Sequence, residues 1–458
     1  MAIATINPTN GVVEEEFAAH DGAEVERRIA QAQAAFEGLK STTFAQRGEW
    51  LNKAADLLEA DVDSLAVTLV REMGKPIGQA KAEVLKSAKG LRFYAKNAAE
   101  FLEDEWLADA SAVGASKAGA RYQPIGVVLA VMPWNYPLWQ ALRFAAPALA
   151  AGNVGLLKHA SNVPQAAIYL DTLFSRAGFP AGAFQSLLIG ARDVKAVIED
   201  PRVKAVTLTG SEPAGRSVAS IAGDAIKKTV LELGGSDPFI VLPSADLEAA
   251  SDTAVKARLL NNGQSCIAGK RFIVHADVYD KFTELFVAKM AAAKVGDPLD
   301  PETVLGPLAT ESGRDEVADL VKDAIAKGAK VLTGGVVPDQ PGWWYPATVV
   351  ADIPDNALMV MEEAFGPVAS LYKAKDIDDA IRIANQTRFG LSSAVWVNDT
   401  ADEAKCVEEL DAGAVFVNGM TASYNELPFG GVKASGYGRE LAAVGMREFM
   451  NLKTVWKG

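Results

Sequence analysis

Apolar and polar positions follow a helical period over the first part of the chain. In residues 23–104, apolar side chains recur at spacings of three and four, which predicts successive amphipathic helices. From residue 119 onward, short apolar runs are separated by helical stretches. This strand–helix–strand order is typical of βαβ units, so the pattern predicts an α/β fold with mostly parallel sheets.

The ends of the predicted strands carry distinctive residues. The runs 126–132, 154–158, 184–190, 204–210 and 229–235 lead into or end at proline, lysine or glycine. Ligands bind at the carboxyl ends of strands in such sheets, so these ends are where we expect the functional residues. A second α/β block begins with the predicted strand at 237–243, and the tail NLKTVWKG contains a further strand-like run.

Length and charge limit the classes of protein. A chain of 458 residues is too long for one ordinary core and suggests two or three domains. The net charge of −13 argues against nucleic acid and anionic membranes as partners. No apolar stretch reaches the ~20 residues that span a bilayer, and the N-terminus lacks the features of a secretory signal.

Cysteine and histidine usage suggests the compartment and argues against a metal centre. The two cysteines, Cys266 and Cys406, are too few to staple a large chain, which fits a reducing cytoplasm. The three histidines are scattered without zinc spacing, so we expect no metal site. Cys406 stands among acidic residues of a predicted helix, and we expect it to be structural.

Cys266 is the candidate nucleophile. It ends the run NNGQSC, in which a helix stops, the chain turns at Gly263, and the cysteine precedes a strand. Lys270 and Arg271 follow closely, and positive charge favours the reactive thiolate. The alternative is a small buried apolar side chain, which is the usual role of a free cysteine when spacing alone is considered.

Two further residues suggest how such a thiol would act. Glu232 ends an apolar strand before two glycines, where partial burial would raise its pKa and make it a general base. Asn135 lies between the prolines of PWNYP, and an amide on a rigid turn suits a developing oxyanion. A strand-end surface glutamate and ordinary turn chemistry are the alternatives.

Cofactor signals are distributed over three segments. Lys158 ends a strand, and Gly210 and Ser211 end another at a predicted helix start, where backbone N–H groups bind phosphate. Glu363 and Phe365 stand in EAFGP, an acid for ribose hydroxyls beside a ring for a nicotinamide. None of these is a GxGxxG fingerprint.

Together these motifs resemble the aldehyde dehydrogenase superfamily over essentially the whole chain. The separation of ELGG and GQSC places Glu232 and Cys266 34 residues apart, a specific combination. The matching segments are PWNYP (133–137), LLKHAS (156–161), TLTGS (207–211), LELGG (231–235), NNGQSC (261–266), EEAFGP (362–367) and LPFGGVKASGYGRE (427–440).

The resemblance implies a role for each matching position. Cys266 would attack an aldehyde, Asn135 and the Cys266 backbone N–H would hold the oxyanion, and hydride would leave for the nicotinamide. Glu232 would then activate water to hydrolyse the thioester. The implied cofactor-binding residues are Trp134, Asn135, Lys158, His159, Ala160, Ser161, Gly210, Ser211, Leu233, Glu363 and Phe365.

The resemblance also implies three parts. Residues 1–106 and 127–235 would form a Rossmann-like cofactor-binding domain, and residues 236–426 an α/β catalytic domain. Residues 107–126 and 427–458 would form a small β oligomerisation arm. Members of the family are usually homodimers or homotetramers through this arm.

Position 161 bears on the cofactor. Many relatives that prefer NAD carry glutamate there, which would repel the 2′-phosphate of NADP. Ser161 can donate a hydrogen bond to that phosphate, and Lys158 adds positive charge. We therefore predict that NADP is preferred and that NAD is possible.

The substrate is predicted from a narrower resemblance, to the compact NAD(P)-dependent succinate-semialdehyde dehydrogenases. Arg143 stands where carboxylate-recognising relatives have an arginine, and Ser423 precedes PFGG as a second donor. Leu260 departs from relatives with a second arginine there. An ω-semialdehyde is therefore the predicted substrate, and small aliphatic or aromatic aldehydes are the alternative.

Three rival activities remain. A CoA-acylating relative would pass the thioester to a thiol, but such enzymes often lack the glutamate found here at 232. A non-catalytic descendant is disfavoured because Cys266, Glu232 and Asn135 occur together. A cysteine hydrolase would need a histidine base, and no motif marks one.

Overall fold

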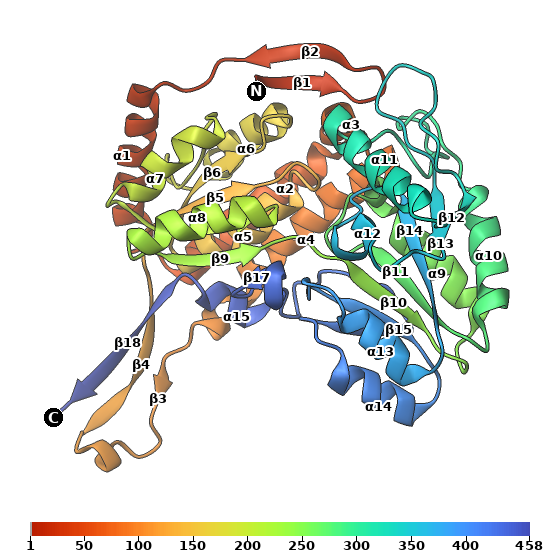
Figure 1. Cartoon of the computed structure of the whole chain (residues 1–458). Helices are drawn as coiled ribbons and strands as arrows, with labels where there is room; N and C mark the ends of the chain where they lie inside the picture. Colours follow the sequence, from red (N-terminus) through yellow and green to blue (C-terminus); the bar gives the residue numbers. More distant parts are fainter. Residues whose placement is uncertain (1) are drawn as a thin grey trace.

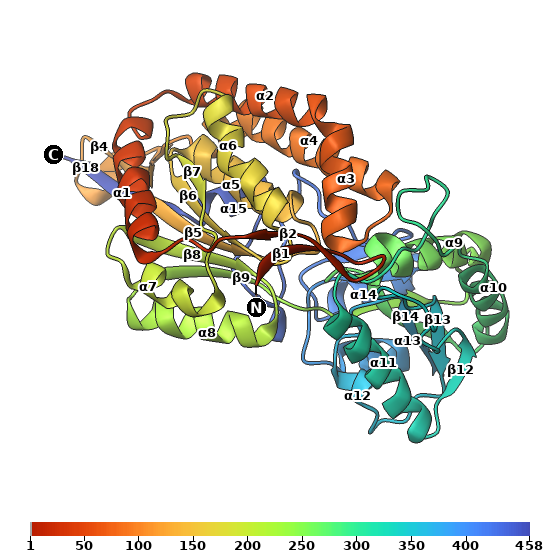
Figure 2. The same ribbon diagram turned by 90° about the horizontal axis from the view of Figure 1, so that it is seen from above.

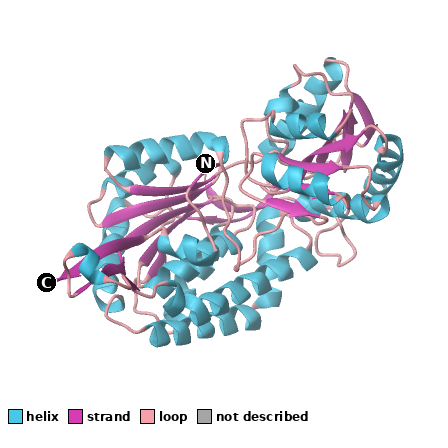
Figure 3. Cartoon of the chain, turned by 90° about the horizontal axis from the view of Figure 1, so that it is seen from below, coloured by secondary structure: helices cyan, strands magenta, loops and turns pink. Residues whose placement is uncertain are grey.

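A computed structural model describes residues 2–458. Two α/β lobes lie side by side, and an antiparallel strand arm extends from the first lobe (Figure 1). Seen from above, the helices of the N-terminal part cover the first lobe, and the second lobe stands apart at its side (Figure 2). The strands gather into separate sheets within the two lobes (Figure 3).

The first lobe is built on a six-stranded sheet. The strand order is β17-β9-β8-β5-β6-β7, and all neighbours are parallel except β17. Its core strands are apolar on both faces, as parallel sheets covered by helices require. The strands are β5 (Val127–Met132), β6 (Val154–His159), β7 (Phe184–Ser186), β8 (Val203–Thr209), β9 (Lys228–Glu232) and β17 (Gly436–Tyr437).

Helix α5 runs through the interior of this lobe. All 13 of its residues are buried, although Gln140 and Arg143 are polar. A buried helix must give such side chains partners or a cavity, so α5 is one element that builds a site. The helices of the lobe are α1 (Gly22–Leu39), α2 (Phe44–Ala60), α3 (Val62–Met73), α4 (Ile77–Phe101), α5 (Trp139–Ala151), α6 (Pro164–Arg176), α7 (Val194–Glu199), α8 (Glu212–Asp224) and α15 (Ala442–Arg447).

The second lobe has a seven-stranded sheet in the order β12-β13-β14-β11-β10-β15-β16, in which only β12 is antiparallel. Its strands are β10 (Asp237–Val241), β11 (Gly269–His275), β12 (Lys330–Thr333), β13 (Thr348–Ala351), β14 (Val368–Ala374), β15 (Ser393–Trp396) and β16 (Val415–Val417). Its helices are α9 (Leu247–Leu259), α10 (Tyr279–Ala291), α11 (Glu311–Ala326), α12 (Leu358–Met361), α13 (Ile377–Asn385) and α14 (Thr400–Glu409).

Two small antiparallel units complete the chain. The hairpin β1 (Ile3–Asn7) and β2 (Val12–Phe17) links the lobes, because the Pro8 carbonyl accepts from Trp343 N–H at 3.0 Å. The arm consists of β3 (Glu105–Trp106), β4 (Lys117–Pro124) and β18 (Met450–Lys457), in the order β18-β4-β3.

The predicted α/β class, with two mainly parallel sheets and a small β arm, is confirmed. The C-terminal segment divides differently from the predicted boundary at 427. Residues 436–437 pair with β9 of the first lobe, and α15 packs on α4 and α5. From residues 427–458, only β18 pairs within the arm.

Candidate active site

Cys266 follows a tight turn between α9 and β11. Asn261 and Asn262 both have φ of 58° and Gly263 has 74°, so three successive residues adopt the left-handed backbone. Asparagine and glycine tolerate this conformation better than other residues. The Asn262 amide fixes the turn through three backbone hydrogen bonds, to Gly74 O and Pro307 O at 2.9 Å and from Gly306 N–H at 2.8 Å.

Two buried cations support the loop from below. Lys270 Nζ donates to the backbone oxygens of Ser265 and Cys266 at 2.7 Å and pairs with Glu363 at 3.0 Å. Arg258 Nη2 donates to the backbone oxygen of Gly263 at 2.5 Å. These hydrogen bonds satisfy the buried backbone oxygens of the loop and restrict its movement. They therefore fix the position of the Cys266 side chain.

The ionisation of Cys266 departs from the prediction. Burial raises the pKa of its thiol to about 12, and the charges of Lys270 and Arg143 only partly oppose this. The predicted help from Arg271 is absent, because its guanidinium turns to the backbone oxygens of Ser236, Ile383 and Ala384. Desolvation therefore outweighs the neighbouring positive charge, and the sulfur is held as a thiol at neutral pH.

Cys266 lies between two cavities. The α4 cavity, of about 280 Å³, is bounded by residues 78–86 of α4, residues 136–143 and residues 420–423. The strand-end cavity, of about 410 Å³, lies at the carboxyl ends of the first-lobe strands. Because Cys266 lines both, molecules that enter from the two sides can meet at its sulfur.

Asn135 lies at the turn after β5 and is 4% exposed. Its Nδ2 donates to the backbone oxygen of Gln264 at 3.0 Å, and its Oδ1 has no partner among the described residues. An amide nitrogen has two hydrogens, so one donor remains for a ligand beside Cys266.

The turn that carries Asn135 is anchored by a buried ion pair that the sequence analysis did not identify. Lys75 donates to the Asn135 backbone oxygen at 3.0 Å and pairs with Glu83. Glu83 Oε1 also accepts from the backbone N–H groups of Leu138 and Trp139, at 2.9 and 3.0 Å. These contacts fix the start of α5 against α4.

Glu232 ends β9 and is 2% exposed. Neither carboxylate oxygen has a hydrogen-bond partner in residues 2–458. Burial raises its pKa well above the usual value, and the charge of Glu440 raises it further, while Arg143 and Arg439 oppose the shift. Glu232 lines neither cavity in this conformation.

Most of the predicted cofactor residues converge on the strand-end cavity. Trp134 and Phe365 meet edge to face at 5.7 Å, and Glu363 stands near Gly234, where an added Cβ would lie 2.4 Å from Glu363 Oε2. Glycine at 234 therefore lets the cavity exist. The predicted residues that line it are Trp134, Asn135, Gly210, Ser211, Leu233, Glu363 and Phe365.

The segment 158–161 lies at the end of the neighbouring strand β6 and outside the lining of that cavity. Lys158 is 9% exposed, and burial lowers its pKa. His159 turns inward: its ring contacts the Pro137 backbone oxygen at 2.8 Å and accepts from Ala160 N–H. Burial lowers the His159 pKa to about 4, so its imidazole is neutral. The Ser161 carbonyl is held by the Ala4 N–H at 3.1 Å.

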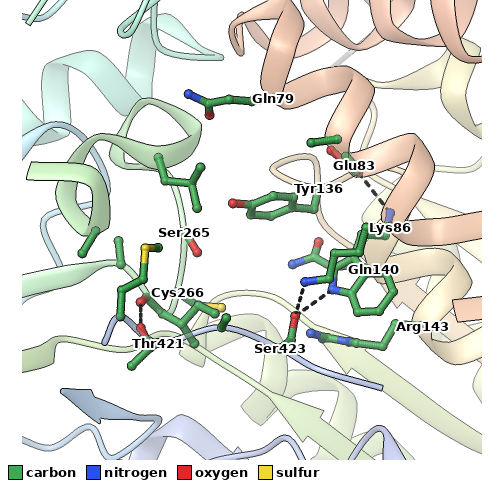
Figure 4. A pocket seen from close by; sticks show the side chains of 18 of the residues that line it. Gln79, Glu83, Lys86, Tyr136, Gln140, Arg143, Ser265, Cys266, Thr421 and Ser423 are labelled. Atoms are coloured by element: carbon green, nitrogen blue, oxygen red, sulfur yellow. Dashed lines mark hydrogen bonds between the residues drawn. The ribbon is translucent and has the colours of Figure 1, made fainter. Parts of the chain in front are cut away.

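Arg143 and Ser423, the two residues predicted to bind the substrate, both line the α4 cavity, but their interactions differ. Arg143 Nε lies 2.5 Å from Glu440, and its guanidinium also covers the Phe429 ring. Ser423 Oγ accepts hydrogen bonds from Lys86 Nζ at 2.7 Å and from Trp139 Nε1 at 3.1 Å (Figure 4).

Several residues that line the α4 cavity were not predicted from the sequence. Lys86 and Gln79 come from α4, far from any motif in sequence, and Tyr136, Gln140 and Thr421 flank the predicted residues. Of these residues, only Glu83 could have been noticed in the sequence, because it is a charged residue within the mainly apolar, buried face of α4. A charge on an apolar helix face calls for a buried partner, and Lys75 is that partner.

Neither a metal-holding cluster nor a membrane-spanning helix is found in the described part of the chain. Within residues 2–458, no group of three or more His, Cys, Asp or Glu side chains is placed to hold a metal ion. No helix in that range combines the length and apolar character needed to cross a bilayer.

Comparisons with known proteins agree with this geometry. The model of the aldehyde dehydrogenase family matches residues 1–455. The chain is 62% identical over 459 aligned positions to a succinate-semialdehyde dehydrogenase (NADP+) of Mycobacterium avium (strain 104), covering 100% of this chain and 97% of the relative. The corresponding protein of Mycobacterium tuberculosis (strain ATCC 25618 / H37Rv) is 61% identical, with 100% of both chains covered.

A solved structure is also similar. The succinic semialdehyde dehydrogenase of Streptococcus pyogenes, in complex with NADP+ as the cofactor, superimposes with a TM-score of 0.96 at 36% identity. The match covers 99% of each chain.

Proposed function

Because the chain belongs to the aldehyde dehydrogenase family, we propose that it oxidises an ω-semialdehyde, with succinate semialdehyde as the preferred substrate, to the carboxylic acid with NADP+. NAD+ is the weaker alternative. The rival substrates are small aliphatic or aromatic aldehydes.

The observation that carries this proposal is the position of Cys266 between two cavities. The strand-end cavity is lined by seven of the residues that were predicted from the sequence to bind the cofactor. The α4 cavity has mainly apolar walls and holds cations opposite the thiol. A thiol between a cofactor site and a substrate site is the arrangement that oxidation of a bound aldehyde requires.

The strand-end cavity fits a dinucleotide. It opens at the N-terminus of α8, where the backbone N–H groups after Ser211 favour phosphate. Glu363 offers a carboxylate for ribose hydroxyls, and Trp134 and Phe365 provide apolar edges. When bound, the oxidised nicotinamide supplies a hydride acceptor. Lys158 and Ser161 would interact with the adenosine ribose and its 2′-phosphate.

The first half of the reaction uses Cys266 and Asn135. The sulfur attacks the aldehyde carbon and forms a thiohemiacetal, while the free Asn135 N–H and the Cys266 backbone N–H stabilise the oxygen anion. The thiolate is the attacking form, so the thiol first gives its proton to water, and the raised pKa of the thiol opposes this loss in the resting site. Collapse of the anion expels hydride and leaves a thioester on Cys266.

The second half uses Glu232. In its carboxylate form Glu232 can remove a proton from water, and burial, which raises its pKa, makes that carboxylate a stronger base. The hydroxide formed attacks the thioester carbon, the C–S bond breaks, and the carboxylic acid leaves. Glu232 lines neither cavity at rest, so this role requires a side-chain rotation toward Cys266.

We also propose roles for the larger parts. The first lobe binds the cofactor, the second lobe carries the nucleophile, and the arm joins subunits into a homodimer or homotetramer. Both cysteines are free, which suits a cytoplasmic enzyme.

A matrix of aldehydes against NADP+ and NAD+ tests the proposed reaction. Succinate semialdehyde with NADP+ should give the highest kcat/KM, and Cys266→Ala should abolish turnover. If NAD+ is used about tenfold more efficiently than NADP+, the cofactor preference is wrong. If CoA is consumed and no free acid appears, the CoA-acylating alternative replaces hydrolysis.

Glu232→Gln separates the two half-reactions. We expect a burst of about one NADPH per active site, followed by steady turnover about 100-fold slower or more, because the thioester lacks its base. Glu248→Gln, an exposed glutamate on α9, is the control. Full steady-state turnover in Glu232→Gln would rule out Glu232 as the deacylation base.

A further inference from the structure

Three charged side chains line the α4 cavity, and two of them are neutralised within the protein. Glu83 pairs with Lys75, and Arg143 pairs with Glu440 at 2.5 Å. Lys86 is the exception: no carboxylate of residues 2–458 lies within 4.0 Å of its Nζ. The net positive charge that faces a ligand in this cavity therefore comes from Lys86.

Arg143 is poorly placed to supply that charge. Its side chain is 3% exposed, its Nη2 contacts Thr209 Oγ1 at 3.3 Å, and its field also acts on Glu232. Two buried acids thus compete for one guanidinium. A substrate carboxylate would have to displace Glu440, which would leave an unpaired charge in the interior.

Ser423 completes a donor pair with Lys86. Its hydroxyl oxygen accepts from Lys86 Nζ at 2.7 Å and from Trp139 Nε1 at 3.1 Å. A hydroxyl has two lone pairs and one hydrogen, so with both lone pairs occupied its O–H remains a donor. Lys86 has three N–H groups, of which one is directed at Ser423, so the pair can donate to both oxygens of a carboxylate.

The surroundings of Lys86 strengthen such an interaction. Its Nζ lies 4.4 Å from the centre of the Trp139 ring, and apolar walls such as Leu260, Ile267 and Phe429 line the rest of the cavity. Burial, and secondarily the charge of Arg143, lower the Lys86 pKa to about 8. An incoming carboxylate would relieve this penalty, because an opposite charge favours the ammonium form.

We propose that Lys86, with the Ser423 hydroxyl, recognises the carboxylate of the semialdehyde substrate, whereas Arg143 is a positioning residue that holds Glu440. This inference rests on the proposed function, because it assigns the substrate class to a particular side chain. Cys266 and Lys86 line the same cavity, so a short aldehyde acid can present one end to each (Figure 4).

A comparison of two aldehydes tests Lys86 directly. Succinate semialdehyde and its methyl ester differ by the negative charge at the end remote from the aldehyde. The ratio of their kcat/KM values, with saturating NADP+, reports recognition of the carboxylate and is insensitive to the fraction of active enzyme. In Lys86→Met this ratio should fall about 10- to 100-fold, mostly through a higher KM for succinate semialdehyde, as loss of a charge-assisted hydrogen bond predicts.

Two further variants complete the design. Lys89→Met removes an exposed lysine from the same helix and should leave the ratio unchanged. Lys86→Arg keeps the charge and should retain most of the preference for the acid. Lys86→Gln provides a second neutral variant if the methionine variant folds poorly.

The outcomes separate the two proposals. An unchanged ratio in Lys86→Met and Lys86→Gln, with a wild-type enzyme that prefers the acid, would overturn the role of Lys86 and leave the proposed function standing. A wild-type enzyme that uses both aldehydes equally well would overturn the proposed substrate class, and the inference with it.

Discussion

At the scale of single residues, the site combines a thiol and a carboxyl group whose pKa values are both raised. Cys266 is half-buried at the junction of the two cavities, and Glu232 is buried beside the acid Glu440. At neutral pH the raised pKa therefore leaves the sulfur mostly as the thiol, which is less reactive than the thiolate. A thiol reacts more slowly than a thiolate with alkylating agents and oxidants.

The raised Cys266 pKa predicts the pH dependence of alkylation. In the ligand-free protein, the rate of reaction with iodoacetamide should rise about tenfold per pH unit between pH 7 and pH 10, because the reactive thiolate fraction grows as pH approaches about 12. The rate is measured by mass spectrometry of intact protein in a Cys406→Ala background. A plateau below pH 8 would show that the resting thiol has an ordinary or lowered pKa.

Ser161 carries the prediction on cofactor choice. In Ser161→Glu, kcat/KM with NADP+ should fall about 10- to 100-fold relative to NAD+, because a carboxylate repels the 2′-phosphate and accepts from a 2′-hydroxyl. Steady-state kinetics with both cofactors measures this ratio.

Ser161→Ala is the matched control for that change. It removes the hydroxyl without adding charge, so the preference for NADP+ should fall by a smaller factor. An unchanged NADP+ to NAD+ ratio in Ser161→Glu would place the 2′-phosphate elsewhere.

At the scale of elements, the turn between α9 and β11 connects both lobes to Cys266, the proposed nucleophile. Asn262, in a left-handed conformation, contacts Gly74 after α3 and the 306–307 segment of the second lobe. Asn261 Nδ2 donates to the Asn135 backbone oxygen at 2.8 Å. The position of the Cys266 sulfur relative to Asn135, the proposed oxyanion donor, is therefore set by side-chain amides rather than by regular secondary structure.

Asn262→Ala tests the importance of this turn. Loss of three buried hydrogen bonds, together with left-handed backbone at alanine, should lower the free energy of unfolding by about 2–4 kcal/mol. A displaced sulfur should lower kcat/KM about 100-fold. Urea unfolding and steady-state kinetics measure the two effects.

Asn153→Ala is a suitable comparison because Asn153 is also buried and makes three backbone hydrogen bonds, with Ile125, Gly126 and Phe449. It lies outside both cavities, so it should lose similar stability and keep kcat/KM within about threefold. Equal losses of activity in both variants would mean that Asn262 acts through general stability alone.

At the scale of the whole molecule, the arm stands away from both lobes and exposes apolar side chains (Figure 1). Leu452 is 53% exposed and Trp456 is 54% exposed, both on β18. A small sheet of this kind buries little of its own surface, and the exposed apolar side chains along it fit the proposed contact with another subunit.

The double substitution Leu452→Glu/Trp456→Glu should therefore shift the protein from an oligomer toward a single chain, because charged side chains would be buried at the contact. Light scattering after size exclusion measures the mass. Ile226→Glu changes a 94% exposed residue of the first lobe and should leave the mass unchanged. A wild-type protein that is already monomeric, or a double variant of unchanged mass, would contradict the assigned role of the arm.

Local sequence signals predicted the features that depend on near neighbours. Glycine and proline at strand ends marked where β5, β8 and β9 stop, and the resemblance to the aldehyde dehydrogenase family, carried by those motifs, is confirmed. The predicted strand at 184–190 is shorter, since β7 ends at Ser186. The pattern of apolar residues does not indicate how far a neighbouring strand continues. For this reason the predicted strand is longer than β7.

The sequence by itself determined which residues stand at the strand ends, because turn and strand chemistry are encoded within a few positions of each motif. Only the tertiary structure decided the ionic state of those residues. The sequence predicted Arg143 as the residue that binds the substrate carboxylate, but the structure pairs it with Glu440. Lys86 belongs to no sequence motif, and only the packing of α4 brings it beside Ser423. Charge pairing and desolvation depend on groups that are distant in sequence, so they are fixed when the lobes and the C-terminal segment pack together.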